Sequence, residues 1–353
     1  MTTVRAEALH ALVSQVCEKL GTPREQADLV AGTLVGSNLC GFDSHGVFRL
    51  AQYRDWIAQG LLKPASVPVV ASERGFAVRV DGRQAFGQVV ATFATRLAIA
   101  KALRDGIAAV TAYNSNHVGR LADYAGAIKD AGLIGLVMVN DSGSGQCVVP
   151  WGGVDPRLAT NPLAMGIPGE ATPGILFDFA TSTAASGKIR QLLLQGQAAP
   201  AGWLVDAAGK DTTDPAVLFT DPKGALLPFG GHKGYALSLA IEVLSGILSG
   251  SGFSRPDPGP EEMNGLFLLA LNPEWFMPAE EFRRQVDQLI AYIKSARPRP
   301  GGGPVLVPGE PDRVEAERRS REGIPLNART VETLRQLCQA VGVDCKALDG
   351  IGD

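Results

Sequence analysis

IAAVTAYNSNHVGRLADYAGAIKDAGLIGLVMVN, residues 107–140, is the stretch that decides the fold. Its apolar runs at 107–113 and 134–140 are short and bounded by polar or glycine residues, which predicts two buried strands. The segment between them, 120–131, has the spacing of a helix. Buried strands that alternate with helices are typical of an α/β fold.

Outward from this core the pattern changes. The first 60 residues predict three amphipathic helices, and short strands with turns then begin near residue 69. A long helix is predicted over 86–104, an apolar helix over 235–248, and further helices over 279–296 and 330–341. We therefore expect helical chain ends around a mixed α/β centre.

Composition limits the functional class. The 353 residues are 45% hydrophobic and 20% charged, and their net charge is −3, so there is no electrostatic case for nucleic acid or an anionic membrane. No apolar run has the length of a membrane span, and the N-terminus lacks a signal layout. The five cysteines are odd in number and contain no C-x-x-C pair. They favour reduced thiols in a cytoplasmic protein without a zinc site.

Three of the four histidines lie in dense polar and glycine motifs. Imidazole is the side chain whose ordinary pKa suits proton transfer near neutral pH, so this placement points to acid–base chemistry. Each motif alone is also compatible with an ordinary surface or hydrogen-bonded histidine. The motifs are Asp43-Ser44-His45-Gly46-Val47-Phe48-Arg49, Asn114-Ser115-Asn116-His117-Val118-Gly119 and Phe229-Gly230-Gly231-His232-Lys233-Gly234.

The first motif predicts a substrate site. A helix that begins near Ser44 would place His45, Arg49 and Tyr53 on one face. An arginine fork grips a carboxylate at two points, while a neighbouring imidazole can hand a proton to a carbonyl oxygen. Reduction of a 2-oxo acid needs that pair. The alternative is a structural salt bridge for Arg49 and a capping role for His45.

The second motif ends a predicted strand and precedes a helix, a position where side chains commonly line a site. Asn116 and His117 are candidates for binding substrate oxygens, and His117 is a second candidate acid. Asn140 and Asp141 end the next apolar strand and can reach the same cleft.

The third motif has the physics of a phosphate cradle, since it combines exposed amides, a helix start and Lys233. It is not a Walker A loop, and no G-x-G-x-x-G fingerprint occurs in the chain. A nucleotide site therefore cannot rest on a Rossmann unit.

Several blocks of the chain together resemble the type-2 malate/L-lactate dehydrogenase family, which are non-Rossmann NAD(P)-dependent oxidoreductases of 2-hydroxy acids. The resemblance runs nearly the full length in the expected order. It is carried by Ser44-His45-Gly46 with Arg49, Asn114-Ser115-Asn116-His117, Trp151-Gly152-Gly153, Thr160-Asn161-Pro162-Leu163-Ala164, Asp178-Phe179-Ala180-Thr181-Ser182, Gly187-Lys188-Ile189, Pro308-Gly309-Glu310-Pro311 and Gly323-Ile324-Pro325-Leu326.

The resemblance implies a homodimer. Its helical domain would come from both chain ends, residues 1–70 with 305–353, and its central mixed-sheet domain, residues 71–304, would bind NAD or NADP and the substrate. It implies that His45, supported by Ser44, exchanges the proton and that Arg49 binds the substrate carboxylate, with Asn116 and Thr160 nearby. In some relatives the second histidine, here His117, is catalytic instead. The implied cofactor contacts are Asp178, Phe179, Ala180, Thr181, Lys188, His232, Lys233, Gly309 and Glu310, although Asp178 also fits the catalytic group.

Two departures from the family pattern bear on the substrate. Val118 stands where an aromatic residue is common, and Asp141 stands where many relatives have a small or hydroxyl residue. A carboxylate at 141 would repel an anionic 2-oxo acid and stabilise a cationic iminium, unless it caps a turn.

Three functions remain open at this stage. The first is a reductase or dehydrogenase of small 2-oxo/2-hydroxy acids. The second is a reductase of cyclic or N-alkyl ketimine carboxylates. The third is a nucleotide-binding module without turnover.

Overall fold

A seven-stranded mixed sheet is the centre of the molecule in a computed structural model of the chain, which describes residues 1–143, 145–255 and 263–350. The strand order is β2-β3-β4-β11-β5-β6-β7, and only β3 and β4 pair in parallel. The predicted α/β class with a mixed sheet is confirmed. The strands are β2 (Val69–Arg74), β3 (Ala77–Ala85), β4 (Ile107–Ser115), β5 (Ile134–Asp141), β6 (Leu163–Ile167), β7 (Ile175–Phe179) and β11 (Asn264–Leu271).

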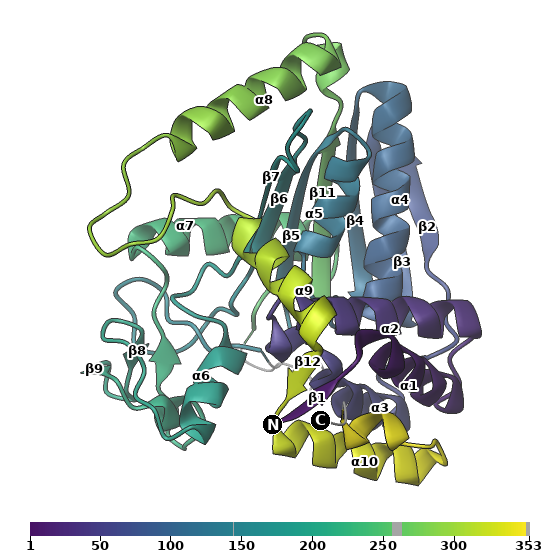
Figure 1. Cartoon of the computed structure of the whole chain (residues 1–353), viewed down its shortest axis with the longest axis vertical. Coiled ribbons are helices and arrows are strands. Elements are labelled where there is room, and N and C mark those ends of the chain that lie inside the picture. Colours follow the sequence, from purple (N-terminus) through teal and green to yellow (C-terminus); the bar gives the residue numbers. More distant parts are fainter. Residues whose placement is uncertain (144, 256–262, 351–353) are drawn as a thin grey trace.

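Helices cover both faces of this sheet. α4 (Gly87–Asp105) and α5 (Ala122–Asp130) pack on one face, where Gly135 of β5 leaves room for Ile128 of α5 (Figure 1). The opposite face is covered by α7 (His232–Ile241) and the π-helical turn η4 (Glu242–Ile247). There Gly265 of β11 lies directly against the backbone of Ser245. Glycine is required at both positions because any Cβ would meet these neighbours at less than 3 Å.

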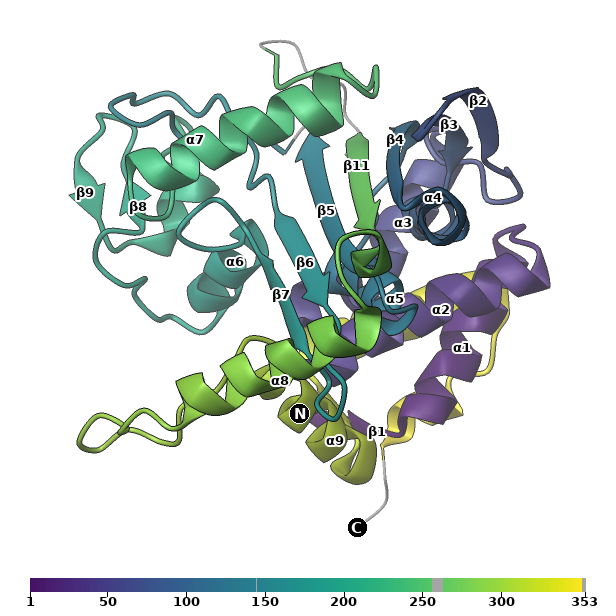
Figure 2. The ribbon, with the colours of Figure 1, turned by 90° about the horizontal axis from the view of Figure 1, so that it is seen from above.

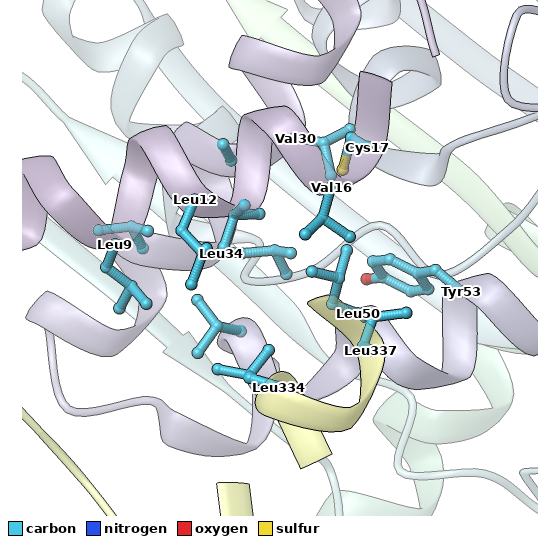
Figure 3. Packing of buried hydrophobic residues seen from close by; sticks show 14 of the residues in the cluster. Leu9, Leu12, Val16, Cys17, Val30, Leu34, Leu50, Tyr53, Leu334 and Leu337 are labelled. Atoms are coloured by element: carbon cyan, nitrogen blue, oxygen red, sulfur yellow. The ribbon is translucent and has the colours of Figure 1, made fainter. Parts of the chain in front are cut away.

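Both chain ends gather in one helical region below the sheet (Figure 1). Its helices are α1 (Ala6–Lys19), α2 (Arg24–Leu39), α3 (Leu50–Ala58), α9 (Glu310–Glu322) and α10 (Ala328–Val341). A short antiparallel pair, β1 (Thr2–Val4) with β12 (Ile324–Leu326), joins the two ends. One buried cluster contains leucines and valines from α1 to α3 together with Leu334 and Leu337 of α10 (Figure 3). Burial of these side chains is what holds the chain ends together.

A smaller lobe lies beyond β7, on the side of the sheet away from β2 (Figure 2). It contains α6 (Ser186–Leu194) and the short strands β8 (Leu204–Val205), β9 (Asp211–Thr212) and β10 (Ala225–Leu226) around its own apolar cluster. α8 (Ala279–Lys294) runs past the ends of β6 and β7. Across the described residues, no helix combines the length and apolar character needed to cross a bilayer.

Candidate functional site

The sheet brings the carboxyl ends of three strands to one edge. β4 and β5 both run antiparallel to β11, and two further antiparallel steps give β7 the same direction. His117 follows β4, Asp141 is the last residue of β5, and Asp178 lies next to the end of β7. Residues that the sequence separates widely therefore share this edge, which we call the carboxyl edge.

The segment that carries His45 is not the continuous helix that the spacing predicts. Two short 3-10 turns, Asp43–His45 and Val47–Arg49, are separated by Gly46 in extended conformation. The cause is Asn38 of α2, whose Oδ1 accepts a hydrogen bond from the Val47 backbone N–H at 2.9 Å. A Cβ on Gly46 would lie 2.2 Å from the same Oδ1. The premise that His45, Arg49 and Tyr53 share one helix face is therefore wrong.

His45 and Arg49 are nevertheless joined through Ser44. The Ser44 hydroxyl lies 3.0 Å from His45 Nδ1, and Arg49 Nε donates to the Ser44 carbonyl at 3.0 Å. Arg49 also donates to Gln52 Oε1 at 2.7 Å. Desolvation, with the charges of Arg49 and Arg120 as smaller causes, lowers the pKa of His45 to about 3. His45 is thus a neutral imidazole at neutral pH.

His117 lies directly beside His45. The two rings are stacked with centroids 5.5 Å apart and planes 26° from parallel. His117 is only 5% exposed, and burial lowers its pKa well below the ordinary value, with Arg49 and His45 as further causes. Two neutral imidazoles therefore stand together next to one guanidinium. The two histidine motifs, which lie far apart in the sequence, therefore meet in the fold.

Asp178 presents the third titratable group of the edge. Its Oδ2 accepts a hydrogen bond from the Ala122 backbone N–H at the start of α5 at 2.9 Å. Burial raises its pKa to about 6, while that backbone contact and the charge of Arg120 act in the opposite direction. A carboxyl group with this pKa exchanges its proton near neutral pH.

The segment after β7 is tied to the start of α7. Thr181 accepts a hydrogen bond from the Phe229 backbone N–H at 3.0 Å, and its own hydroxyl donates to the carbonyls of Thr160 and Asn161. A Cβ on Gly234 would meet the Thr181 carbonyl at 2.5 Å, so the glycine motif permits this close approach. The predicted cofactor residues 178–181 and His232-Lys233 are thereby brought together, with His232 and Lys233 exposed.

An open aromatic surface flanks this junction. The Trp151 and His232 rings are 5.6 Å apart, and Phe179, which is 40% exposed, meets Phe229 edge-on at 5.6 Å. Exposed rings beside glycine-turn amides and Lys233 suit a flat base and its phosphates. The residues present therefore fit a nicotinamide dinucleotide.

α6 borders the His45 segment. A Cβ on Gly187 would lie 2.6 Å from the Ser44 Cβ, so glycine is needed for this contact. Lys188, one residue further, lies with its Nζ 5.9 Å from the centre of the Trp203 ring.

Two further predicted residues, Asn116 and Asp141, have hydrogen-bond partners in the backbone. The Asn116 amide donates to three backbone carbonyls, those of Leu61, Gln84 and Ala85, each at 3.3 Å. Asp141 Oδ1 accepts hydrogen bonds from the Gly143 and Met263 backbone N–H groups at 2.9 and 3.2 Å. These contacts of Asp141 are typical of a carboxylate that caps a turn.

Gly309 and Glu310 are not brought to the carboxyl edge. They lie beside the opposite end of β7, where the Pro308 carbonyl accepts from the Leu176 backbone N–H. Glu310 pairs there with Lys294 and accepts from the Val307 backbone N–H at 3.0 Å. Both line a cavity of about 540 Å³ that α8 borders. A cofactor that contacts Gly309 and Glu310 as well as the residues of the carboxyl edge must therefore extend along β7.

Sequence reasoning missed a buried carboxylate that organises the edge. Glu242 is 5% exposed and accepts four hydrogen bonds, from Asn140 Nδ2, Asn161 Nδ2 and the Ser254 amide and hydroxyl. It links the end of β5 to the turn that holds Thr181. A signal existed, because Glu242 is the one charged residue within the apolar run 235–248.

Comparisons with known proteins find relatives along nearly the whole chain. The family model described as malate/L-lactate dehydrogenase matches residues 4–335. Malate dehydrogenase of Pyrococcus abyssi is 37% identical over 348 residues, which is 96% of this chain and 94% of the relative. The solved structure of malate dehydrogenase from Pyrococcus horikoshii OT3 is 36% identical with a TM-score of 0.87, covering 97% and 96% of the two chains.

A second similar solved structure is that of an enzyme with a different activity. The Δ1-piperideine-2-carboxylate reductase of Pseudomonas syringae pvar. tomato is 32% identical with a TM-score of 0.85, covering 96% of this chain and 100% of that one. Fold and relatives together define a nicotinamide-dependent oxidoreductase, and its described residues form a mixed sheet rather than a Rossmann unit. The chain belongs to the malate/L-lactate dehydrogenase family. The resemblance inferred from the motifs is confirmed.

Proposed function

We propose that this enzyme transfers hydride between NADH or NADPH and a small 2-oxo acid, and runs the reverse reaction on the 2-hydroxy acid. The observation that carries the proposal is the neutral His45–His117 pair, stacked at 5.5 Å and joined through Ser44 to Arg49. Arg49 binds the substrate carboxylate with its planar fork. One of the imidazoles then exchanges the proton with the substrate oxygen.

The charge of a bound substrate changes the pKa values of the two imidazoles. Burial is the largest cause of the lowered pKa of both imidazoles, and the guanidinium of Arg49 is a smaller cause. A substrate carboxylate bound to Arg49 offsets that smaller cause, so both pKa values rise when the substrate binds. Asp178, with a pKa of about 6, supplies a second proton-exchanging group at the same edge.

The cofactor is NAD or NADP, and when bound it supplies or accepts the hydride. We assign its contacts to residues 178–181, Lys188, His232 and Lys233, and to Gly309 and Glu310 at the far end of β7. The exposed rings and glycine-turn amides support this assignment. Thr160 and Asn116 belong to the neighbouring substrate side in this proposal.

The test follows nicotinamide absorbance at 340 nm with a panel of small 2-oxo acids, using NADH and NADPH in parallel. We expect turnover with one or more 2-oxo acids and a preference for one of the two cofactors. Nicotinamide binding without turnover on any substrate would favour a binding module without catalysis and would contradict the proposal.

A second candidate function is reduction of a cyclic or N-alkyl ketimine carboxylate. It is favoured by the similarity to the piperideine-2-carboxylate reductase. Asp141, the residue whose charge would suit an iminium, has backbone partners that are typical of a turn cap. We therefore rank keto acids first and include cyclic imines in the same panel, where faster turnover of an imine would reverse the ranking.

We also propose that two copies of the chain form a homodimer in the cytoplasm. The face of α7 and η4 directed away from the sheet carries exposed apolar side chains, and the scattered, odd-numbered cysteines suit a reducing compartment. Light scattering after size exclusion tests the dimer, and a mass of one chain, 37.0 kDa, would contradict it.

For the organisation of each chain we propose one unit from residues 1–70 with 305–353 and another from 71–304. The buried cluster that joins α1, α2, α3 and α10 supports the first unit. Limited proteolysis is expected to cut between the units before it cuts within them.

A further inference from the structure

A buried chain of hydrogen bonds ends on His117. Gln88 Nε2, near the start of α4, donates to the Tyr53 hydroxyl oxygen at 2.7 Å. That oxygen lies 2.8 Å from His117 Nδ1. Gln88 and Tyr53 have no exposed surface, and His117 is 5% exposed. Three residues that are distant in the sequence thus form one hydrogen-bonded chain that ends at a ring nitrogen.

The direction of this chain follows from the chemistry of its members. Gln88 Nε2 can only donate, so the Tyr53 oxygen is an acceptor in the first bond. A phenol is a good donor, while the bare nitrogen of imidazole is far more basic than a phenol oxygen. Donation from Tyr53 to His117 Nδ1 also aligns both bonds, so that each polarises and strengthens the next.

We propose that two residues position His117: Tyr53 fixes it in the tautomer with its proton on Nε2, and Gln88 holds the Tyr53 hydroxyl in place for that bond. The ring then offers an N–H donor on the nitrogen that Tyr53 does not contact. Which ring nitrogen carries the proton is set by the hydrogen bond that the other one makes. The use of this donor on a substrate oxygen rests on the proposed function, whereas the tautomer itself does not.

Packing keeps Tyr53 in place for this role. Its ring meets Phe86 edge-on with centroids 5.7 Å apart, and it also contacts Trp56. Figure 3 shows Tyr53 within the buried cluster that holds Leu50 and Leu337. The Tyr53 side chain therefore connects the helical region to His117 and is held rigidly by its neighbours. With a fixed N–H donor on His117, the two histidines take different roles: His117 holds the substrate oxygen and His45 exchanges the proton.

The direct test is the ¹⁵N NMR spectrum of the full-length protein with labelled histidine. The chain has only four histidines, so substitution of His10 and His232 simplifies the assignment. We expect His117 Nδ1 to resonate as a bare nitrogen and Nε2 as a protonated one at neutral pH. A protonated Nδ1 would overturn the proposal, and this readout needs no turnover, so it is independent of the proposed reaction.

Variants separate positioning from simple packing. Tyr53→Phe keeps the ring but removes the hydroxyl, so we expect a mixture of tautomers and a fall in kcat of about 10- to 100-fold with little change in cofactor affinity. Gln88→Leu keeps the Tyr53 hydroxyl but removes the donor behind it. We expect it to preserve the tautomer with a smaller fall in kcat.

The matched control is Tyr124→Phe. Tyr124 is another buried tyrosine, and its hydroxyl donates to the carbonyl of Val118, the residue after His117, rather than to the imidazole. We expect it to leave the His117 tautomer unchanged and kcat within about 2-fold. An unchanged tautomer in Tyr53→Phe, or an equal change in Tyr124→Phe, would overturn the proposal. If Tyr53→Phe fails to fold, the wild-type and Gln88→Leu spectra still test the proposal, because a protonated Nδ1 on His117 in either protein would overturn it.

Discussion

The two sides of the candidate site differ in how far the chain itself satisfies their polar groups. On the histidine side, His45, Arg49 and His117 are already joined to Ser44, Gln52 and Tyr53. On the α7 side, His232 and Lys233 are exposed beside the open rings of Trp151 and Phe179.

We interpret this contrast as a division of roles between the two sides. Groups that must hold a fixed geometry for proton transfer are preorganised by the fold, because small misplacements of reacting groups slow catalysis. Groups that bind a large, separate molecule are left open to it. Substitutions on the two sides should therefore change different kinetic constants.

The largest effect is expected for His45→Ala on the preorganised side. Removal of a proton-transferring group should lower kcat by about 10²- to 10⁴-fold. Steady-state kinetics at saturating cofactor measures this. A fall of less than 10-fold would transfer the role to His117, whose own alanine variant should then show the larger loss.

Acid should lower the stability of the folded protein, because the fold buries His45 in its neutral form. The pKa of His45 is about 3 in the folded chain against 6.5 ordinarily, so its contribution to stability is complete above pH 6.5 and is lost as pH falls toward 3. Between pH 7 and pH 5 this amounts to about 2 kcal/mol of unfolding free energy.

Urea denaturation of wild type and His45→Asn at both pH values isolates the imidazole. In both proteins Asp178 has the opposite effect on the unfolding free energy, which it raises as the pH falls, because burial raises its pKa to about 6. An equal pH dependence in the two proteins would show that His45 is not held neutral by the fold.

A smaller effect is expected for Arg49→Lys. A lysine carries the charge but not the two-point fork, so KM for carboxylate substrates should rise about 10-fold. Cofactor affinity should stay the same, since Arg49 belongs to the histidine side. An unchanged KM would remove Arg49 from the substrate site.

The smallest effect is expected at Asp141. Because its carboxylate caps backbone N–H groups of Gly143 and Met263, Asp141→Ser should cost about 1 kcal/mol of unfolding free energy, while Asp141→Asn, which keeps Oδ1, should cost less. The ratio of imine to keto-acid turnover should not change in either variant. A selective loss of imine reduction would instead support the iminium role.

Local patterns were sufficient for much of the fold. The strands at 107–113 and 134–140 and the helix between them follow from periodicity within a few residues, and they appear as β4, β5 and α5. The family motifs also predicted His45, His117 and Asp178 as site residues. The sheet places His117 and Asp178 at one edge, and the His45 ring stacks on His117. These features depend on short-range sequence and on the direction of strands.

What failed depends on contacts between distant segments. The helix predicted from Ser44 is broken because Asn38 of another helix takes the Val47 N–H. The β1–β12 pair joins three residues near each chain end, too short to leave a pattern. Gln88 lies in an apolar helix with no motif around it, so only the fold reveals its bond to Tyr53.

The most direct test of the divided site is a pair of dissociation constants for the reduced nicotinamide cofactor, measured by fluorescence. We expect His45→Ala to bind it within about 2-fold of wild type and Lys233→Ala to bind it about 10-fold more weakly, which corresponds to about 1.4 kcal/mol. Equal weakening in both variants, or none in Lys233→Ala, would contradict the division between a preorganised histidine side and an open cofactor side.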